Sequence, residues 1–346
     1  MMISRILLFI FATVILSACE TTSFISLEVQ RPAEVNFSAP VKMIVVVDNA
    51  VSQPNNFGHL VYAFQKKQDN LSFDAEAFRR LFVNNLVQKL KSDNKIPVSS
   101  SRIYSSKTYN ESKALESSEV KAIISSTGTE VIISVDNSLI ASLYRLNYVH
   151  DENLYRLTFD ASHSTALNVF EKVGDSIVMN KVIHKDSLYW ETFDYSSEAV
   201  VVRFPDKKIC MEDLINHSIE SLCKKLFSNK EIVQRTIYGT GISNMLDATR
   251  YAKQNKWTEA SCIWEYEFEI SKNNRLKGFC AANLALYNEV IDQFDQAIYW
   301  ANVAKGNFQK DEKSRINSDD KSMDSYINDL KQRKVEVTLL EQQKDN

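Results

Sequence analysis

The sequence predicts a protein of the α+β or α/β class, in which a mixed-sheet α/β domain precedes an α-helical domain. Two runs of β-branched apolar residues, 41–47 and 130–136, are typical of interior strands, with helical patterns between them. Alternating polar and apolar runs follow, as in half-buried antiparallel strands. From residue 244 onward, small and aromatic residues recur at helical spacing. For 346 residues we expect two domains.

Residues 1–18 have the layout of an export signal peptide. Arg5 precedes an apolar core, 6–16, that is about half the ~20 residues needed to span a bilayer. The residues that close it, Leu16-Ser17-Ala18-Cys19, resemble a bacterial lipobox. The resemblance implies cleavage before Cys19, a lipid on its thiol, and acyl chains such as palmitate. The alternative is a plain secretory signal with an incidental cysteine.

Residues 19–39 are predicted to form a tether, with 24–29 as a short edge strand. Glu20 is not the aspartate that retains lipoproteins at the inner membrane of enteric bacteria. We therefore expect the outer membrane and a protein that faces the periplasm, with surface exposure left open. Stable anchoring takes at least two lipid signals, which an acylated lipoprotein N-terminus supplies.

The α/β domain is predicted over residues 40–227. The strand 41–47 is followed by Asp48, and Ser72 begins a helix that stops near Lys91. A shorter helix stops at Gly128 in the manner of a C-terminal cap. The strand 130–136 then ends on Asp136. This order of strand, helix, helix and strand predicts a parallel pair.

Hairpin strands come next, because 154–161, 166–170 and 177–190 alternate in polarity. A helix over 212–227 closes the domain. This order over 40–227 resembles the α/β domain of envelope-assembly lipoproteins, such as the curli-type secretion lipoprotein and the activators of peptidoglycan synthases. A fold of this kind does not name a function.

After a linker over 228–243, residues 244–312 resemble tetratricopeptide repeats. The second unit has these pattern residues: Asn283, Leu284, Ala285, Asn288, Asp292, Phe294, Ala297, Ala301 and Ala304. The first has these at the same offsets: Ala248, Tyr251, Asn255, Trp257, Ala260 and Trp264. Ala260 and Ala297 are 37 residues apart, and about 34 is usual. An amphipathic capping helix is predicted over 319–342.

Stacked helix pairs of this kind expose a concave face that binds peptides. The repeat alignment assigns five residues to a partner groove: Met245, Thr249, Lys253, Leu286 and Glu289. The alternative is that the neighbouring domain buries the same residues.

Four cysteines lie beyond Cys19, in a compartment where disulfides form. Cys210 and Cys223 on one helix would be about 20 Å apart, whereas a bridge needs Cα atoms within about 7 Å. Cys262 and Cys280 fall on adjacent antiparallel helices, where a disulfide is feasible. The alternative is four buried thiols that pack as small apolar residues.

No pattern of residues identifies a reaction. The five histidines are scattered without metal-ligand spacing, and the common hydrolase and phosphate-binding motifs are absent. We therefore predict no metal and no cofactor. Asp48 and Asp136 follow parallel strands, where ligands of open sheets bind, so a hydrolase site at that edge is one hypothesis. A net charge of −3, without a basic cluster, argues against nucleic acid.

Signal, lipobox, sheet and repeats together resemble an uncharacterised family of Gram-negative envelope lipoproteins with tetratricopeptide-like C-termini. The resemblance rests on four segments: 16–19, 41–48, 130–136 and 248–304. It implies a protein attached to a membrane by its N-terminal lipid, which acts as a non-catalytic binding or scaffold protein for an envelope protein. The alternatives are the envelope hydrolase and a small-ligand sensor.

Overall fold

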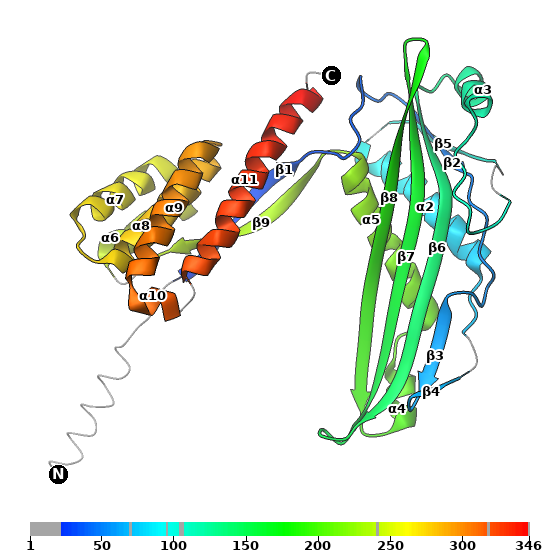
Figure 1. Ribbon diagram of the computed structural model, residues 1–346, viewed down its shortest axis with the longest axis horizontal. Coiled ribbons are helices and arrows are strands. Elements are labelled where there is room, and N and C mark those ends of the chain that lie inside the picture. Colours follow the sequence, from blue (N-terminus) through cyan, green and yellow to red (C-terminus); the bar gives the residue numbers. More distant parts are fainter. Residues whose placement is uncertain are drawn as a thin grey trace. The chain divides into compact units, whose positions relative to one another are not determined.

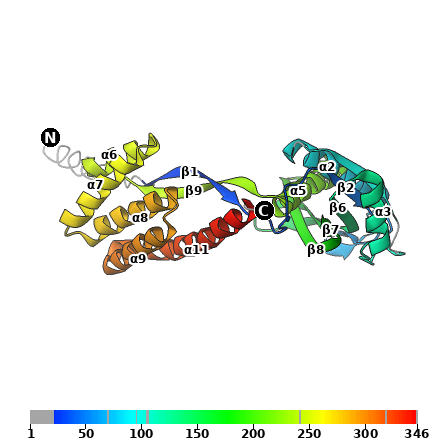
Figure 2. The same cartoon turned by 90° about the horizontal axis from the view of Figure 1, so that it is seen from above.

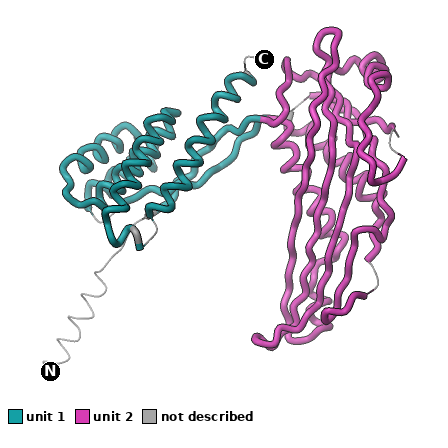
Figure 3. Tube along the Cα trace, in the orientation of Figure 1, with its two compact units in different colours: residues 1–32, 228–345 teal, residues 33–227, 346 magenta. Residues whose placement is uncertain are grey.

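The computed structural model describes residues 22–68, 71–94, 96–103, 107–239, 242–316 and 319–344. The chain divides into two compact units. Unit 1 holds the described residues up to Pro32 and from Ser228 onward, and unit 2 holds Ala33–Phe227 (Figure 3). The predicted signal peptide and the predicted lipid attachment at Cys19 lie outside the described residues.

Unit 2 combines a mixed sheet with packed helices, so the predicted α+β class is confirmed. Its strands are β2 (Ile44–Asp48), β3 (His59–Ala63), β4 (Lys66–Lys67), β5 (Val98–Arg102), β6 (Val131–Val149), β7 (Leu154–Val173) and β8 (Ser176–Asp194). Its helices are α2 (Ala75–Asn94), α3 (Ser117–Thr127), α4 (Ser197–Arg203) and α5 (Lys207–Leu226).

The sheet is organised around β6. The first part of β6 pairs in parallel with β2, as predicted, and β2 pairs in parallel with β5. A later part of β6, residues 142–146, pairs in parallel with β3. The other edge of β6 pairs with β7, and β7 pairs with β8, so three long strands form an antiparallel meander (Figure 1).

In this region one sequence prediction was wrong and one strand was not predicted. The runs 154–161 and 166–170 are not separate strands, because residues 162–165 continue the alternation and β7 is one strand of 20 residues. β5 was missed in the sequence because three of its five residues are serines, which carry no apolar signal.

The meander has one covered face and one largely open face. Residues of α2 and α5 pack against one face in a single apolar cluster, which includes Phe82, Leu214, Leu157 and Val182. Part of the opposite face is covered by α3, whose Val120 packs in a smaller cluster with strand residues of β2 and β6. The helix α3 ends at Gly128, as predicted, with φ at 72°.

Unit 1 is mostly helical. Its elements are β1 (Thr22–Arg31), β9 (Asn229–Tyr238), α6 (Ser243–Lys253), α7 (Trp257–Ile270), α8 (Asn274–Val290), α9 (Phe294–Lys310), α10 (Glu312–Ile316) and α11 (Asp319–Lys344). Small residues allow α8 and α9 to approach closely. An ideal Cβ placed on Gly278 of α8 would lie 2.3 Å from the ring of Phe308 on α9, which is fully buried.

The expected tether 19–39 and linker 228–243 are both largely structured. Residues 22–31 form β1 and residues 229–238 form β9, and the two strands pair antiparallel along their whole length. Figure 2 shows this ribbon beside the helices of unit 1. The sequence suggested a strand only for 24–29, within β1. It gave no strand for β9, because that segment is rich in charged and polar residues and resembles a linker.

Candidate functional site

The open face of the meander shows a regular alternation of exposed and buried residues along β8. Odd-numbered residues of β8 from 179 to 193 are exposed, whereas Val182, His184 and their even-numbered neighbours turn toward the helices. Several exposed side chains are apolar. Ile183 is 63% exposed and Tyr189 is 49% exposed, so apolar surface gathers on one face, which is typical of interaction sites.

A shallow groove crosses this face. Ala141 of β6 pairs with Ser162 of β7, and Ser162 pairs with Ser187 of β8, so three small residues lie in one row across the strands. The groove has a volume of about 280 Å³ and is also lined by Leu60 and Leu143. Because small side chains leave the backbone uncovered, another chain can approach the sheet closely here.

A loop beside the groove is held tightly to β6. Gly58 has a φ of 79°, a conformation that favours glycine, and its carbonyl accepts the amide of Ser142 at 2.9 Å. The Gln53 side chain donates to the carbonyl of Ile140 at 2.7 Å and accepts its amide at 2.9 Å. These bonds fix one end of the groove.

The far rim of the open face carries charge. Arg156 donates to Glu191 at 2.7 Å and to the hydroxyl of Tyr189 at 2.7 Å. All three side chains are partly or largely exposed. The surface therefore joins an apolar centre to a polar rim, the usual composition of a protein interface. The alternation of β8 signals a half-buried strand, but the sequence alone could not tell that its outer face stays open.

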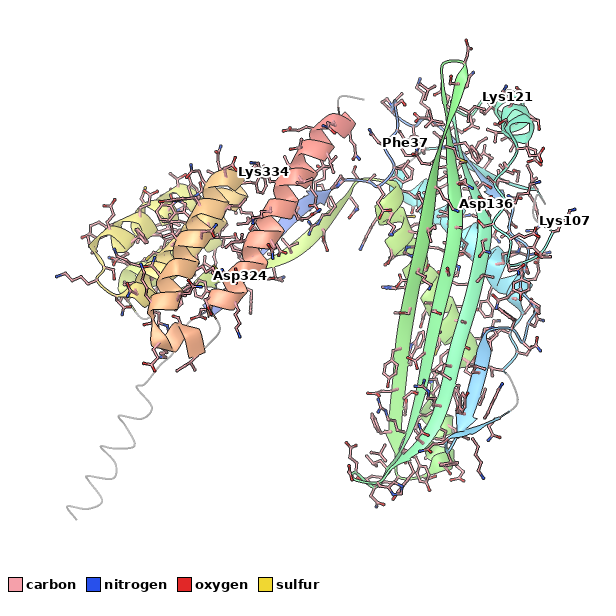
Figure 4. The ribbon with its side chains drawn as sticks, in the orientation of Figure 1. Phe37, Lys107, Lys121, Asp136, Asp324 and Lys334 are labelled. Carbon is pink, nitrogen blue, oxygen red and sulfur yellow. The ribbon has the colours of Figure 1, made fainter. Side chains whose placement is uncertain are left out.

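Asp136 does not end a strand, as the sequence suggested. It lies inside β6 at a register shift between Val135 and Asn137 (labelled in Figure 4). Its carboxylate is fully buried and accepts hydrogen bonds from Ser134 at 2.5 Å, Asn49 at 2.7 Å and Asn168 at 2.6 Å. Burial raises the pKa of Asp136, against the opposite effect of these three bonds.

Asp48 does lie at the end of β2, as predicted, but its charge is compensated. One carboxylate oxygen of Asp48 accepts from both Arg79 of α2 and Arg102 of β5. Asp48 and Arg79 are both buried. Asn49 connects this pair to Asp136. The two carboxylates are therefore held by partners within the protein at this edge of the sheet, Asp48 by two arginines and Asp136 by three hydrogen bonds.

The five residues predicted to line a partner groove are mostly buried. Met245, Thr249, Leu286 and Glu289 are each less than 10% exposed, and only Lys253 is exposed. These four residues are therefore not accessible as predicted. They are buried within unit 1, whereas the alternative was that the neighbouring domain buries them. Met245 and Leu286 belong to the same buried cluster as residues of β9. The chain's own ribbon occupies that face.

Glu289 holds the ribbon in place. Its carboxylate accepts from Arg235 of β9 at 3.0 Å, and from Tyr326 and Arg333 of α11 at 2.7 and 2.9 Å. At the end of β9, Asn283 of α8 bonds to both the amide and the carbonyl of Tyr238, at 2.9 and 2.8 Å. Lys253 and Glu289 both line a polar cavity of about 390 Å³ beside β1.

Cys262 and Cys280 do not form the disulfide that the sequence left open. Cys262 is exposed and Cys280 is buried, and both are free thiols. The thiol of Cys280 points toward the sulfur of Met245, 3.6 Å away. Cys210 and Cys223 are also free and buried, so three of the four pack as small apolar residues.

No group of three or more histidine, cysteine, aspartate or glutamate side chains is arranged to hold a metal ion in the described part of the chain. Among the same residues, no helix has the length and apolar character needed to cross a bilayer.

Comparison with known families divides the chain at nearly the same place as the structure does. A domain of unknown function, DUF6340, matches residues 246–332, within unit 1. A second domain of unknown function, DUF8603, matches residues 41–238, more than half of the chain. A search of curated proteins found no match. The predicted resemblance to an uncharacterised family is confirmed at this level, and the chain belongs to the DUF8603 family.

Proposed function

We propose that the protein is a non-catalytic binding or scaffold protein of the bacterial cell envelope, attached to a membrane by a lipid on Cys19. The outer membrane, on the side that faces the periplasm, is the proposed location. The open face of the β6–β8 meander is the proposed binding surface for an envelope protein. The observation that carries the binding role is the exposed apolar row of β8 beside the groove at Ser162.

The arrangement of the buried carboxylates supports binding over catalysis. Asp48 is paired with two arginines, and Asp136 is buried under three hydrogen bonds. These contacts favour a structural role for the two carboxylates over an acid–base role.

We also propose that α6–α9 are two tetratricopeptide-like units. The alanines of the pattern support this, because Ala248, Ala260, Ala297, Ala301 and Ala304 are all fully buried in helix contacts. In this protein the ribbon takes the place that a bound peptide has in such repeats, so the helical unit serves as a support for unit 2.

The lipid attachment is tested by Cys19→Ala, with Cys262→Ala as the control because Cys262 is an exposed thiol in the described part of the chain. We expect Cys19→Ala to move the protein from the membrane fraction to the soluble fraction and to abolish labelling by a palmitate analogue, while Cys262→Ala changes neither. Membrane retention and labelling of the Cys19→Ala protein would contradict the proposal.

The binding surface is tested by placing a photo-cross-linking amino acid at Leu143 or at Ser187 in intact cells. We expect one protein to be captured from both positions, and none from Tyr266, an exposed residue of α7. Ser162→Arg would fill the groove and abolish the adduct, whereas Ser118→Arg on exposed α3 would not. Capture that is unaffected by Ser162→Arg would rule out this face.

A further inference from the structure

β8 is a long edge strand that has neither a proline nor a bulge, and Lys181 and Lys185 are the charged residues of the kind that usually protects such an edge. Among the described strands it pairs with β7 alone. The β7–β8 register runs without a shift from Tyr155–Asp194 to Val173–Ser176, so no bulge interrupts the edge. β8 also contains no proline. Natural proteins usually interrupt such an edge, because its unpaired backbone groups are a template for another strand.

The outward side chains of β8 are complementary to themselves in the reverse direction. Reading outward from Asp186, the exposed residues are Ser187, Tyr189, Glu191 and Phe193 on one side and Lys185, Ile183, Lys181 and Met179 on the other. An antiparallel copy centred at Asp186 would place apolar residues opposite apolar residues. It would also place Lys181 of each chain opposite Glu191 of the other.

We propose that two copies of this chain associate through antiparallel pairing of their β8 strands about a twofold axis at Asp186. The pairing joins the two meanders into one continuous sheet. In this register the outer face gains two Met179–Phe193 pairs, two Ile183–Tyr189 pairs and two Lys181–Glu191 ion pairs. Directly opposed pairs of these kinds are the ones that stabilise antiparallel sheets. The interface is isologous, as twofold dimers require.

Neighbouring registers give a poorer match. Because one face of β8 packs on helices, only shifts by an even number of residues keep every side chain on its own face. A shift of the pairing sum by two places Glu191 opposite Met179 in one direction and opposite Ile183 in the other, so a carboxylate faces an apolar side chain. A shift by four, centred at Leu188, pairs Lys185 with Glu191 and Ile183 with Phe193, but it leaves Met179 and Lys181 beyond the end of the partner strand. The register centred at Asp186 is favoured because it pairs all eight exposed residues within β8.

The axis itself brings two Asp186 carboxylates together. Each is partly buried on the helix side of β8, 3.5 Å from the Nε2 atom of His217 and 3.8 Å from that of His184. Like charges directly opposite weaken an antiparallel pair. This unfavourable contact distinguishes the proposed register, because only here does the removal of a charge at Asp186 strengthen the dimer.

The test is sedimentation equilibrium of the soluble chain, residues 20–346, over a range of concentrations. We expect Lys181→Glu and Glu191→Lys each to weaken the dimer by about tenfold, because each creates two like-charge pairs. The double variant Lys181→Glu/Glu191→Lys should recover most of the affinity. A double variant that dimerises more weakly than either single variant, without recovery of affinity, would overturn the register.

Three further variants complete the experiment. Ile183→Lys should weaken the dimer by about tenfold or more, whereas Ile232→Lys, at an equally exposed position of β9 in unit 1, should have no effect. Asp186→Asn should strengthen the dimer. None of these changes a buried apolar residue. A chain that stays monomeric at every concentration, or a dimer that is indifferent to Ile183→Lys, would overturn the proposal.

Discussion

The face of α6 and α8 that bears Met245 and Leu286 is covered by β9 of the same chain, whereas the face of β8 that bears Ile183 and Tyr189 is exposed. The sequence assigned residues of the first face to a partner groove, and it gave the second only as one face of an alternating strand. The two faces differ because β9 packs against the first, whereas no described element of the chain covers the second. An apolar stripe therefore marks a surface to be covered, and the covering element has to be found separately.

The charged groups differ in the same way. In unit 1, Glu289 is fully buried between Arg235 and Arg333 and joins the ribbon to two helices. On the open face of unit 2, the pair of Arg156 and Glu191 is exposed at the rim. We expect the first cluster to determine stability and the second to influence association, because exposed ion pairs contribute little to folding.

The largest expected effect is that of Glu289→Gln. It removes the negative charge that pairs with the buried guanidinium groups of Arg235 and Arg333. This loss should lower the free energy of unfolding of unit 1 by ~3–5 kcal/mol. The control is Glu28→Gln, because Glu28 forms an exposed pair with Lys230 on the same ribbon and should change stability by less than ~1 kcal/mol. Urea unfolding followed by peptide-resolved hydrogen exchange measures both. Equal effects would contradict the assigned role of Glu289.

A difference in pH dependence should separate the two units. All five histidines lie in unit 2, and burial lowers the pKa of His59 to about 4 and that of His163 to about 3. Below pH 6.5 these histidines become protonated in the unfolded chain, whereas they stay neutral in the folded unit. Each of these histidines therefore costs unit 2 about 1.4 kcal/mol of stability per pH unit as the pH falls toward the folded pKa.

The measurement is urea unfolding by hydrogen exchange at pH 6.5 and 5.5, where carboxylates titrate little. We expect unit 2 to lose stability over this step while unit 1 changes much less. His163→Gln should reduce the slope of unit 2, since it removes one titrating group between Ser138 and Ser218. A parallel loss in unit 1 would exclude the histidines as the cause.

The smallest effects test how closely unit 1 is packed. Gly278→Ala should destabilise unit 1 by ~1–3 kcal/mol, because its Cβ would overlap the buried Phe308 ring. Gly306→Ala on α9 should instead stabilise it by up to ~1 kcal/mol, because a Cβ there meets no atom within 4 Å. Thermal unfolding of the two variants gives the comparison, and shifts of the same sign would contradict it.

The sequence was sufficient for elements with a strong local pattern. The β-branched run before Asp48, the cap at Gly128 and the alternation of β8 each predicted an element that the structure contains. It was insufficient for elements that pairing stabilises. β9 and the serine-rich β5 have weak local signals, and each forms because a partner strand is available.

The candidate site could not be found from the sequence for a related reason. Ala141, Ser162 and Ser187 come from three different strands, and only the register brings them into one row. Asp48 and Asp136 attracted attention as acidic residues that follow strands. Their partners Arg79, Arg102 and Asn168 are distant in the chain, so the sequence alone did not show that these residues bind the two carboxylates.

The β1–β9 ribbon also determines how the protein would respond to tension. The chain enters unit 1 along β1, continues into unit 2 after Pro32, and returns along β9 from Ser228. A force applied between the start of β1 and unit 2 would be carried by the covalent backbone of β1, because Arg31 leads directly into unit 2 and its partner Asn229 is attached at the same end. The ten paired positions of the ribbon would therefore bear little of the load, and such a pull would not separate β1 from β9.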